Sequence, residues 1–330
     1  MRKVCNLKEK SIEYSELAKR ILFEPLQLDV NRLCIVSGYA TPNMASWMIK
    51  NLKEFKANPI DFSLIVGMVP FDGLSISVHE GFKKLQNEKM PSEIEKYQCS
   101  YVCDSVPVHS KVYIWLKDEK PVLAFTGSAN FTQSAFGKGR KEYMVECNPV
   151  EAYRYYCEIE RNTIFCNHAE VEESILLYPT HSVLDMENKP IGSLSGEGIQ
   201  SVSLSLLSRN GETGSKSGLN WGQRNKRNRN EAYIPLPAKI VRTGFFPLNE
   251  QHFTVVTDDG HQLILRVQQE GDKAITTPLS NAQIGEYFRN RLGLANGAYV
   301  WKKDLEAYGR TDVTFYKLDD EQFYMDFSVQ

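Results

Sequence analysis

The order of strand-like and helix-like segments changes about half-way along the chain. In the first half, short apolar runs that end at a glycine or a turn alternate with segments of helical periodicity. The predicted strands cover residues 32–37, 62–66, 108–116, 122–126 and 141–147, and the predicted helices cover residues 42–52, 79–85 and 150–164. This alternation is typical of an α/β domain whose sheet is covered on both faces.

The second half is composed almost entirely of short strands with turn residues between them. The predicted strands cover residues 199–206, 232–237, 253–257, 262–267, 273–277, 313–316 and 322–327, and the one clear helix covers residues 282–292. Such a pattern indicates a small, mainly β barrel. Residues 167–196 have neither character, and we expect a linker there. The predicted domains are therefore 1–166 and 197–330.

The overall composition excludes some classes of protein. The chain has 330 residues and a formal net charge of -2, which by itself gives no indication of a polyanionic partner. No apolar run approaches the roughly 18 residues that span a bilayer, and the N-terminus lacks the apolar core of a signal peptide. All seven cysteines precede residue 167, and none has the spacing of a zinc site. We therefore expect a cytoplasmic protein with reduced thiols and no membrane association.

Five polar residues in the first half follow one another in an order that is typical of a catalytic site. His109 and Lys111 stand two residues apart on a predicted strand, so their side chains should share a face. Ser128 and Asn130 have the same spacing after the next strand, and Glu142 follows 12 residues after Asn130. Each motif alone is more often structural, as a strand histidine or a turn. Their conjunction in this order predicts a catalytic site.

This order of motifs resembles the phospholipase D superfamily, and the flanking residues 126–132 resemble its nuclease branch. The acid usual in that superfamily is missing, because Leu116 stands at its place and Asp118 comes two residues late. The same departure is a feature of the restriction endonucleases of the branch, in which Glu142 matches the acid. Over nearly the whole chain, the sequence resembles NgoFVII-type restriction endonucleases. The resemblance implies a phospholipase D-like N-terminal domain and a B3-like pseudobarrel as the C-terminal domain.

We expect the chemistry of such a site to require no metal ion and no other cofactor. Phosphodiester hydrolysis has a very high barrier, and most nucleases lower it with Mg²⁺. We find no cluster of acids spaced for a metal, so Lys111 would supply the cation, with Ser128 and Asn130 as donors to the phosphate oxygens. The His109 imidazole would attack phosphorus to give a phosphohistidine. Glu142 would accept a hydrogen bond from the ring and stabilise its charged form.

The mechanism of the superfamily uses two His-x-Lys motifs, but this chain has one. The histidines at 79, 168, 181, 252 and 261 have no lysine two residues later. A second imidazole is needed to protonate the leaving oxygen. We therefore predict a homodimer, formed through the N-terminal domain, with a single active site that contains both His109 residues.

A basic segment in the second half is the main candidate for DNA binding. Residues 216–229 contain five basic residues among 14 and no acidic residue. Arginine suits guanine edges and phosphates, whereas Asn and Gln suit adenine edges. The alternative is an ordinary solvated loop. The candidate contacts are Lys216, Asn220, Trp221, Gln223, Arg224, Asn225, Lys226, Arg227 and Arg229.

The resemblance to B3-like domains implies that two arms grip the major groove. The segment 216–230 would be the first arm, and the connection at 268–273 would be the second. The candidate contacts in the second arm are Gln268, Gln269, Asp272 and Lys273, although this connection is also compatible with a simple surface hairpin. Arg266 fits either the arm or the wall of the barrel.

The sequence therefore predicts a site-specific, type II-like restriction endonuclease that cleaves double-stranded DNA without metal. Some members of the resembled family act with a separate helicase-like ATPase subunit, which leaves such a partner open. This chain has no GxxxxGK[ST] motif and would not hydrolyse ATP through one. The alternatives are a phospholipase D-like lipid phosphodiesterase and a non-catalytic DNA-binding protein. The basic segment argues against the first, and the intact five-residue site argues against the second.

Overall fold

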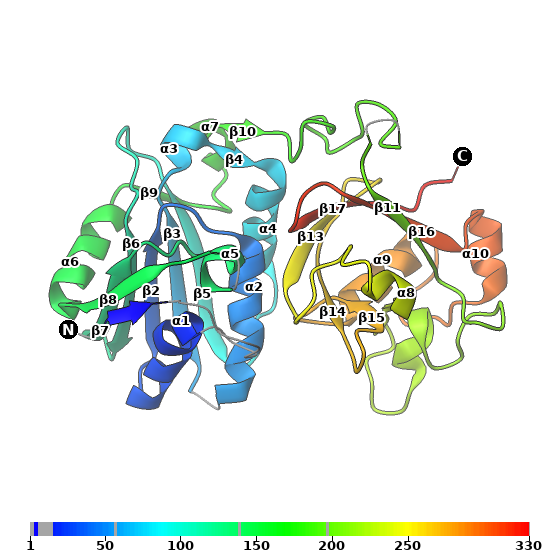
Figure 1. The fold of residues 1–330 in the computed structure, drawn as a ribbon, viewed down its shortest axis with the longest axis horizontal. Coiled ribbons are helices and arrows are strands. Elements are labelled where there is room, and N and C mark those ends of the chain that lie inside the picture. Colours follow the sequence, from blue (N-terminus) through cyan, green and yellow to red (C-terminus); the bar gives the residue numbers. More distant parts are fainter. Residues whose placement is uncertain (1–2, 6–15, 56–57, 138–139, 196–197, 330) are drawn as a thin grey trace. The chain divides into compact units, whose positions relative to one another are not determined.

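The computed structural model describes residues 3–5, 16–55, 58–137, 140–195 and 198–329 (Figure 1). The chain divides into two compact units, Met1–Tyr178 and Pro179–Gln330, and each contains its own large sheet. The first part of the predicted linker lies in the first unit. There, helix α7 (Val171–Ser174) is followed by strand β10 (Leu177–Tyr178), which pairs with β4 (Leu74–Ser75).

The first unit is built on a mixed sheet of eight strands in the order β1-β8-β7-β6-β2-β3-β5-β9. Its strands are β1 Lys3–Cys5, β2 Arg32–Ser37, β3 Ile60–Val66, β5 Ile94–Val102, β6 Lys111–Lys117, β7 Lys120–Gly127, β8 Tyr143–Cys147 and β9 Thr163–Phe165. Strands β2, β3 and β5 run parallel, and β6, β7 and β8 join them through antiparallel pairs. The loops after β2, β3 and β7 and the segment before β6 meet at one edge of the sheet.

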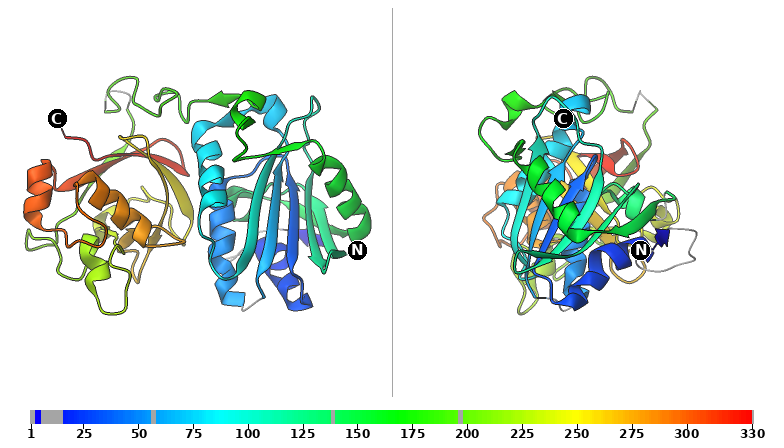
Figure 2. Two further views of the ribbon diagram at one scale, coloured as in Figure 1. Left: turned by 180° about the vertical axis from the view of Figure 1, so that it is seen from behind. Right: turned by 90° about the vertical axis from the view of Figure 1, so that its left-hand side faces the viewer.

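Helices cover both faces of this sheet (Figures 1 and 2). In β2, Cys34 and Val36 pack in a cluster with Ala152 and Tyr156 of α6. Alternation along a strand turns the intervening buried residues to the opposite face, which α2 and α4 cover. The helical segments are α1 Glu16–Ala18, η1 Lys19–Phe23, η2 Glu24–Leu28, α2 Pro42–Asn51, η3 Leu52–Phe55, α3 Val69–Asp72, α4 Ile76–Asn87, α5 Gln133–Phe136 and α6 Pro149–Glu160.

The start of α2 shows how the local sequence fixes a helix end, beside the edge of the sheet where the loops after β2, β3 and β7 meet. Thr41 is the N-cap, and its hydroxyl accepts a hydrogen bond from the Met44 amide at 3.3 Å. Pro42 occupies the first helical position, where its missing N–H costs nothing. The cap confirms the helix start predicted from the sequence.

The second unit is a nearly closed barrel of seven strands. Their order is β11-β16-β17-β13-β14-β15-β12, and the edge strands β11 and β12 contact each other. The strands are β11 Ser201–Ser205, β12 Ile234–Pro235, β13 His252–Thr257, β14 Gln262–Gln268, β15 Ala274–Thr276, β16 Asp312–Lys317 and β17 Gln322–Asp326. The helical segments are η4 Gly218–Gln223, α8 Ala238–Val241, α9 Ala282–Arg291 and α10 Lys302–Tyr308.

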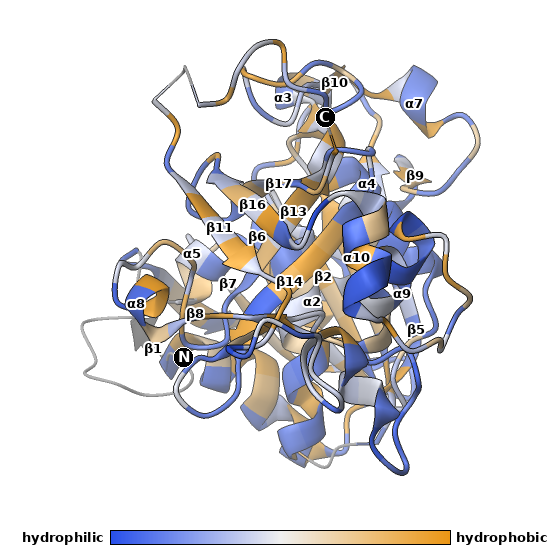
Figure 3. Ribbon diagram, turned by 90° about the vertical axis from the view of Figure 1, so that its right-hand side faces the viewer, coloured by the Kyte–Doolittle hydropathy of each residue, from blue (hydrophilic) through white to orange (hydrophobic). Residues whose placement is uncertain are grey.

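The interior of the barrel contains a large apolar cluster. Phe253 of β13, Phe315 of β16 and Phe323 of β17 are fully buried, and their rings lie against Phe246. Figure 3 shows hydrophobic residues along β13 and β14. The two architectures confirm the predicted α/β first domain and mainly β second domain.

Two further observations concern the described part of the chain as a whole. None of its helices has both the length and the apolar character that crossing a bilayer would require. The thiols of Cys34, Cys99, Cys103, Cys147, Cys157 and Cys166 are free; the side chain of Cys5 lies outside the described part.

Candidate active site and DNA-binding arms

His109 lies in an extended segment before β6, and not within the strand that we predicted from residue 108. The strand begins at Lys111, because Val108 bonds elsewhere: its amide donates to the Gly67 carbonyl at 2.9 Å. His109 is exposed, whereas Lys111 is only 6% exposed. The shared face of one strand is therefore not what brings these residues together.

A hydrogen bond joins Lys111 to His109 instead. The Lys111 ammonium donates to the His109 carbonyl at 2.5 Å. Burial lowers the pKa of Lys111, and the nearby Glu142 carboxylate partly counteracts this effect. A buried ammonium that is held by a hydrogen bond and lies near a carboxylate presents a localised positive charge at this edge of the sheet.

Ser128 and Glu142 form a second pair at the ends of β7 and β8. The Ser128 hydroxyl donates to the Glu142 carboxylate and accepts from the Tyr143 amide at 2.9 Å. The strands approach closely here, since a Cβ at Gly127 would lie 2.1 Å from the Tyr143 carbonyl oxygen. In the described part of the chain, Ser128 and not His109 bonds Glu142. The predicted bond between the imidazole and Glu142 is absent there.

Asn130 is held by the loop that follows β2. Its Oδ1 accepts from the Tyr39 amide at 3.1 Å and from the Ser37 hydroxyl at 3.5 Å. The Phe131 amide donates to the same hydroxyl at 2.9 Å. An Asn amide has two N–H donors besides its acceptor oxygen. Among the described residues we find no partner for these donors, so they are available to a phosphate oxygen.

Tyr39 and Asp72 complete the surroundings of His109, and the sequence reasoning missed both. The Tyr39 ring lies edge-on to the His109 ring, with centroids 5.9 Å apart. The Tyr39 hydroxyl donates to Asp72 at 2.5 Å, which raises the pKa of the phenol. Gly38 allows the loop after β2 to lie close to the His109 ring, because a Cβ at this position would be only 3.0 Å from that ring. The only sequence signal was a Gly-Tyr pair after a buried strand.

The arrangement brings three chemically distinct groups together. An exposed imidazole, a buried ammonium and an available amide donor lie around one edge of the sheet, and they can bind and attack a phosphodiester. None of the five predicted catalytic residues belongs to a His/Cys/Asp/Glu group in the described chain that could hold a metal.

The first predicted arm is ordered by contacts within itself. The Arg227 guanidinium lies over the Trp221 ring at 4.1 Å and pairs with Glu231. Arg224 donates from Nε to the Lys216 carbonyl at 2.8 Å. Arg229 donates to the Gln223 side chain at 2.8 Å. Lys216, Arg224, Asn225, Lys226, Arg227 and Arg229 are exposed.

Asn220 is a correction to the predicted DNA contacts. It is 0% exposed, and its amide group donates to the Val300 carbonyl and accepts from the Val300 amide, both at 2.8 Å. Its side chain therefore bonds within the unit and is closed off from solvent. Asn220 supports the base of the arm and is not placed to contact a base pair.

We expect Asn220→Ala to lower the free energy of unfolding by about 2–4 kcal/mol, because it leaves both backbone groups of Val300 buried and unpaired. Urea denaturation of the full chain measures this loss. The control is Asn225→Ala in the exposed part of the arm, for which we expect a change within about 0.5 kcal/mol. Equal stability of the two variants would contradict the structural role.

The second predicted arm is a tight turn between β14 and β15. Gln269 and Asp272 both have positive φ, and the Asp272 amide donates to the Gln269 carbonyl at 2.9 Å. Gln269 and Lys273 are exposed, while the Gln268 side chain accepts from Thr276. Arg266 is 3% exposed and pairs with Glu250, so it belongs to the barrel wall.

Comparison with protein families identifies both halves. Residues 15–173 match the model of the NgoFVII restriction endonuclease N-terminal PLD domain, in which PLD denotes phospholipase D. Residues 194–319 match the model of the NgoFVII C-terminal B3-like DNA-binding domain. The chain belongs to the NgoFVII restriction endonuclease family. The resemblance inferred from the motifs is confirmed, and the second unit of this NgoFVII-family chain is a B3-like DNA-binding domain.

Three solved structures align with about half of this NgoFVII-family chain. NucT from Helicobacter pylori is 15% identical over 50% of this chain and 98% of its own, with a TM-score of 0.31. The phospholipase D family member Nuc from Salmonella typhimurium is 17% identical over 50% and 95%, with a TM-score of 0.33. A polyphosphate kinase from Porphyromonas gingivalis is 12% identical over 53% and 26%, with a TM-score of 0.31. No curated protein matched the chain.

Proposed function

We propose that this chain is a site-specific DNA endonuclease that hydrolyses phosphodiester bonds without a metal ion, through a phosphohistidine intermediate. The observation that carries the proposal is the buried Lys111 ammonium, bonded to the main chain of His109 and close to Glu142. It provides a fixed positive charge beside an exposed imidazole, in the role that a metal ion has in most nucleases.

The proposed reaction has two steps. A neutral nitrogen of His109 attacks phosphorus, the bond from phosphorus to the leaving oxygen breaks, and a second imidazolium gives its proton to that oxygen. A water molecule then attacks phosphorus and gives a proton to the second imidazole, and the phosphorus–nitrogen bond breaks. Lys111 and the Asn130 amide stabilise the charge on the other phosphate oxygens in both steps.

The second imidazole is proposed to be His109 of a partner subunit. In the first unit, the only other histidines are His79 and His168. His79 is buried against Tyr101, and the described contact of His168 is with the Glu170 amide. Neither of these described contacts involves a proposed catalytic residue, so a homodimer through the N-terminal domain supplies the missing group.

Ser128 holds Glu142 in this proposal. The hydroxyl bridges the carboxylate and the Tyr143 amide, which fixes the carboxylate beside Lys111. In the dimer, the fixed carboxylate would be the partner for an imidazolium.

We assign cleavage and sequence recognition to different domains. Residues 1–166 are proposed to dimerise and cleave, residues 167–196 to connect, and residues 197–330 to read the sequence of double-stranded DNA. The exposed Arg, Asn and Lys residues of the first arm and the exposed Gln269 and Lys273 of the second are the proposed contacts. Phosphate contacts from these residues would make binding depend on salt.

We expect the purified homodimer to cleave plasmid DNA in the presence of EDTA, without ATP and without a separate ATPase subunit. The reason is that Lys111, and not a metal, neutralises the phosphate. Gel analysis of plasmid and oligonucleotide products measures the rate. A Mg²⁺-dependent endonuclease under the same conditions is the control for chelation. Cleavage that appears only after Mg²⁺ is added would reject the metal-independent mechanism.

A further inference from the structure

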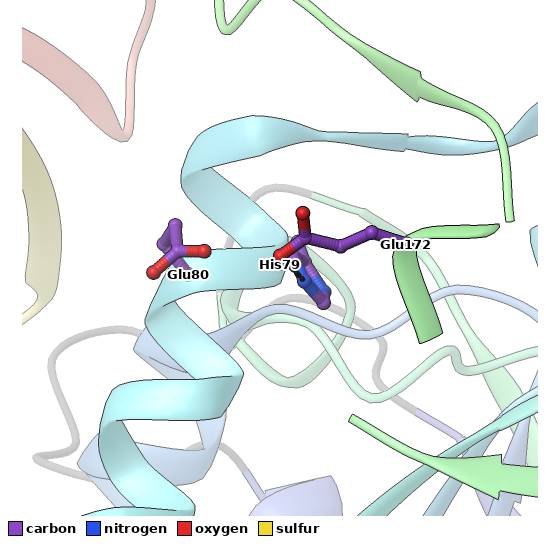
Figure 4. A group of neighbouring side chains, drawn as sticks. All are labelled: His79, Glu80 and Glu172. Atoms are coloured by element: carbon purple, nitrogen blue, oxygen red, sulfur yellow. Dashed lines mark ion pairs between the residues drawn. The ribbon is translucent and has the colours of Figure 1, made fainter. Parts of the chain in front are cut away.

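A second cluster of functional groups lies in the first unit and shares no residue with the proposed active site. His79 and Glu80 come from α4, and Glu172 comes from α7 (Figure 4). One ligand atom from each of the three lies within 4.8 Å of the other two. This is the spacing that donor atoms need to coordinate the same ion.

The burial of His79 distinguishes this cluster from a group of acidic residues on the surface. The residue is 1% exposed, and its Nε2 has no hydrogen-bond partner among the described residues. That nitrogen points at the Glu172 carboxylate across 3.7 Å, too far for a hydrogen bond (Figure 4). A buried polar atom without a partner is costly, so it indicates a ligand or another functional reason.

Tyr101 holds the other side of the His79 ring. Its buried hydroxyl lies 3.1 Å from Nδ1. When Nδ1 carries the proton and donates to this oxygen, the lone pair of Nε2 faces the two carboxylates. Histidines that bind metals are usually oriented by such a bond to the second nitrogen.

The cluster already attracts a cation. The Lys83 ammonium lies 2.8 Å from Glu80 and 2.9 Å from Glu172, so it occupies the space between the carboxylates. Two carboxylates and one ammonium leave a net charge of -1, and a divalent ion in place of the ammonium would bring it to zero. Lys83 is partly exposed, so its long side chain can move into water.

We propose that His79, Glu80 and Glu172 bind a divalent transition-metal ion, which replaces the Lys83 ammonium between the two carboxylates. One imidazole and two carboxylates favour zinc over Mg²⁺ or Ca²⁺, which prefer oxygen ligands alone. Three protein ligands leave a coordination position for water.

The metal would tie α7 to α4. The contacts of the segment that contains α7 with this region include the two-residue pair of β10 with β4, the bond from the Leu74 amide to the Leu176 carbonyl, and the ion pair of Lys83 with Glu172. Helix α7 has only four residues and no side-chain cap at its start. A metal bound by Glu172 adds a crosslink between α7 and α4 close to the C-terminal end of the first unit.

The test is zinc binding by the full chain. The protein is stripped with EDTA, freed of chelator, and titrated with Zn²⁺ in calorimetry, with thermal unfolding as a second measurement. We expect one equivalent of zinc per chain and a higher melting temperature. Glu172→Gln should weaken binding at least about tenfold, because it removes a charged ligand. Lys83→Met should strengthen binding, since it removes the competing ammonium.

The matched control is Glu173→Gln on the same helix, for which we expect unchanged zinc affinity because Glu173 lies outside the cluster. Since Glu172 is exposed, its variant should fold even where a substitution of buried His79 does not. The cysteines could bind zinc elsewhere, but such binding would not respond to Glu172→Gln. Absence of stoichiometric binding, or equal affinity of the Glu172 and Glu173 variants, would reject the site and leave an ion-pair network.

Discussion

Replacing His109 with alanine is expected to reduce the rate of DNA cleavage at least about 10⁴-fold while DNA binding is retained. Lys111 bonds the main chain of His109, the proposed nucleophile, and removal of a nucleophile from a hydrolase typically abolishes most of its rate enhancement. Single-turnover cleavage of a duplex, measured in EDTA, gives the rate. An electrophoretic shift assay gives the affinity for DNA.

The control for this variant is His168→Ala, which removes an exposed histidine of the same unit. We expect it to cleave at the wild-type rate. If His109→Ala cleaves within tenfold of the wild type, the phosphohistidine mechanism is wrong. If it also loses DNA binding, the substitution has damaged more than the chemistry.

Mixed dimers extend the same experiment to the shared site. A dimer with one wild-type subunit and one His109→Ala subunit retains one imidazole, so it lacks either the nucleophile or the acid. Purification with two different tags isolates it. We expect its cleavage rate to be close to that of the dimer that carries His109→Ala in both subunits. A cleavage rate of half the wild-type value would indicate one complete site per subunit.

The second large effect is expected in the first arm. Arg224→Ala combined with Arg227→Ala should weaken DNA binding at least about 30-fold, because each arginine contributes about 1–3 kcal/mol through a base or phosphate contact. Both guanidinium groups are held in the free protein, by the Lys216 carbonyl and by the Trp221 ring. Little side-chain entropy is then lost when DNA binds.

Titration of a labelled duplex at several salt concentrations measures this effect, and the slope against salt should become shallower by about two. The matched control is Arg242→Ala combined with Lys303→Ala, which removes two exposed positive charges of the same unit outside both arms. We expect this control pair to bind DNA nearly as the wild type does. Equal weakening by the two pairs would show that general charge, and not the arm, accounts for binding.

Much of the fold could be predicted from the sequence because burial leaves a clear pattern. The run at 32–37 is apolar on both faces and lies inside a sheet, and Thr41-Pro42 marks a helix start. Strand β5 was missed because its sequence, Ile94 to Val102, mixes charged and polar residues with apolar ones, although the strand pairs with β3 in the sheet. Its place depends on tertiary contacts that periodicity does not report.

The five candidate catalytic residues could be selected from the sequence, but their geometry could not. An extended segment such as 108–110 has the same residue preferences as a strand, so the sequence could not show that β6 begins at Lys111. The contact of Tyr39 with His109 joins residues 70 positions apart and has no local signature. Asn220 was misjudged because a polar residue in a basic segment looks exposed, whereas here it satisfies the backbone of Val300.

The division of the chain has a consequence for how new specificities could arise. Every residue proposed for cleavage lies in Met1–Tyr178, and every residue proposed to contact DNA bases lies in Pro179–Gln330. Substitutions in the arms can therefore accumulate without altering the core of the unit that holds the proposed catalytic residues. Such a protein can change its target during evolution while its catalyst is conserved, and the same separation makes it a suitable starting point for engineered nucleases with exchanged recognition modules.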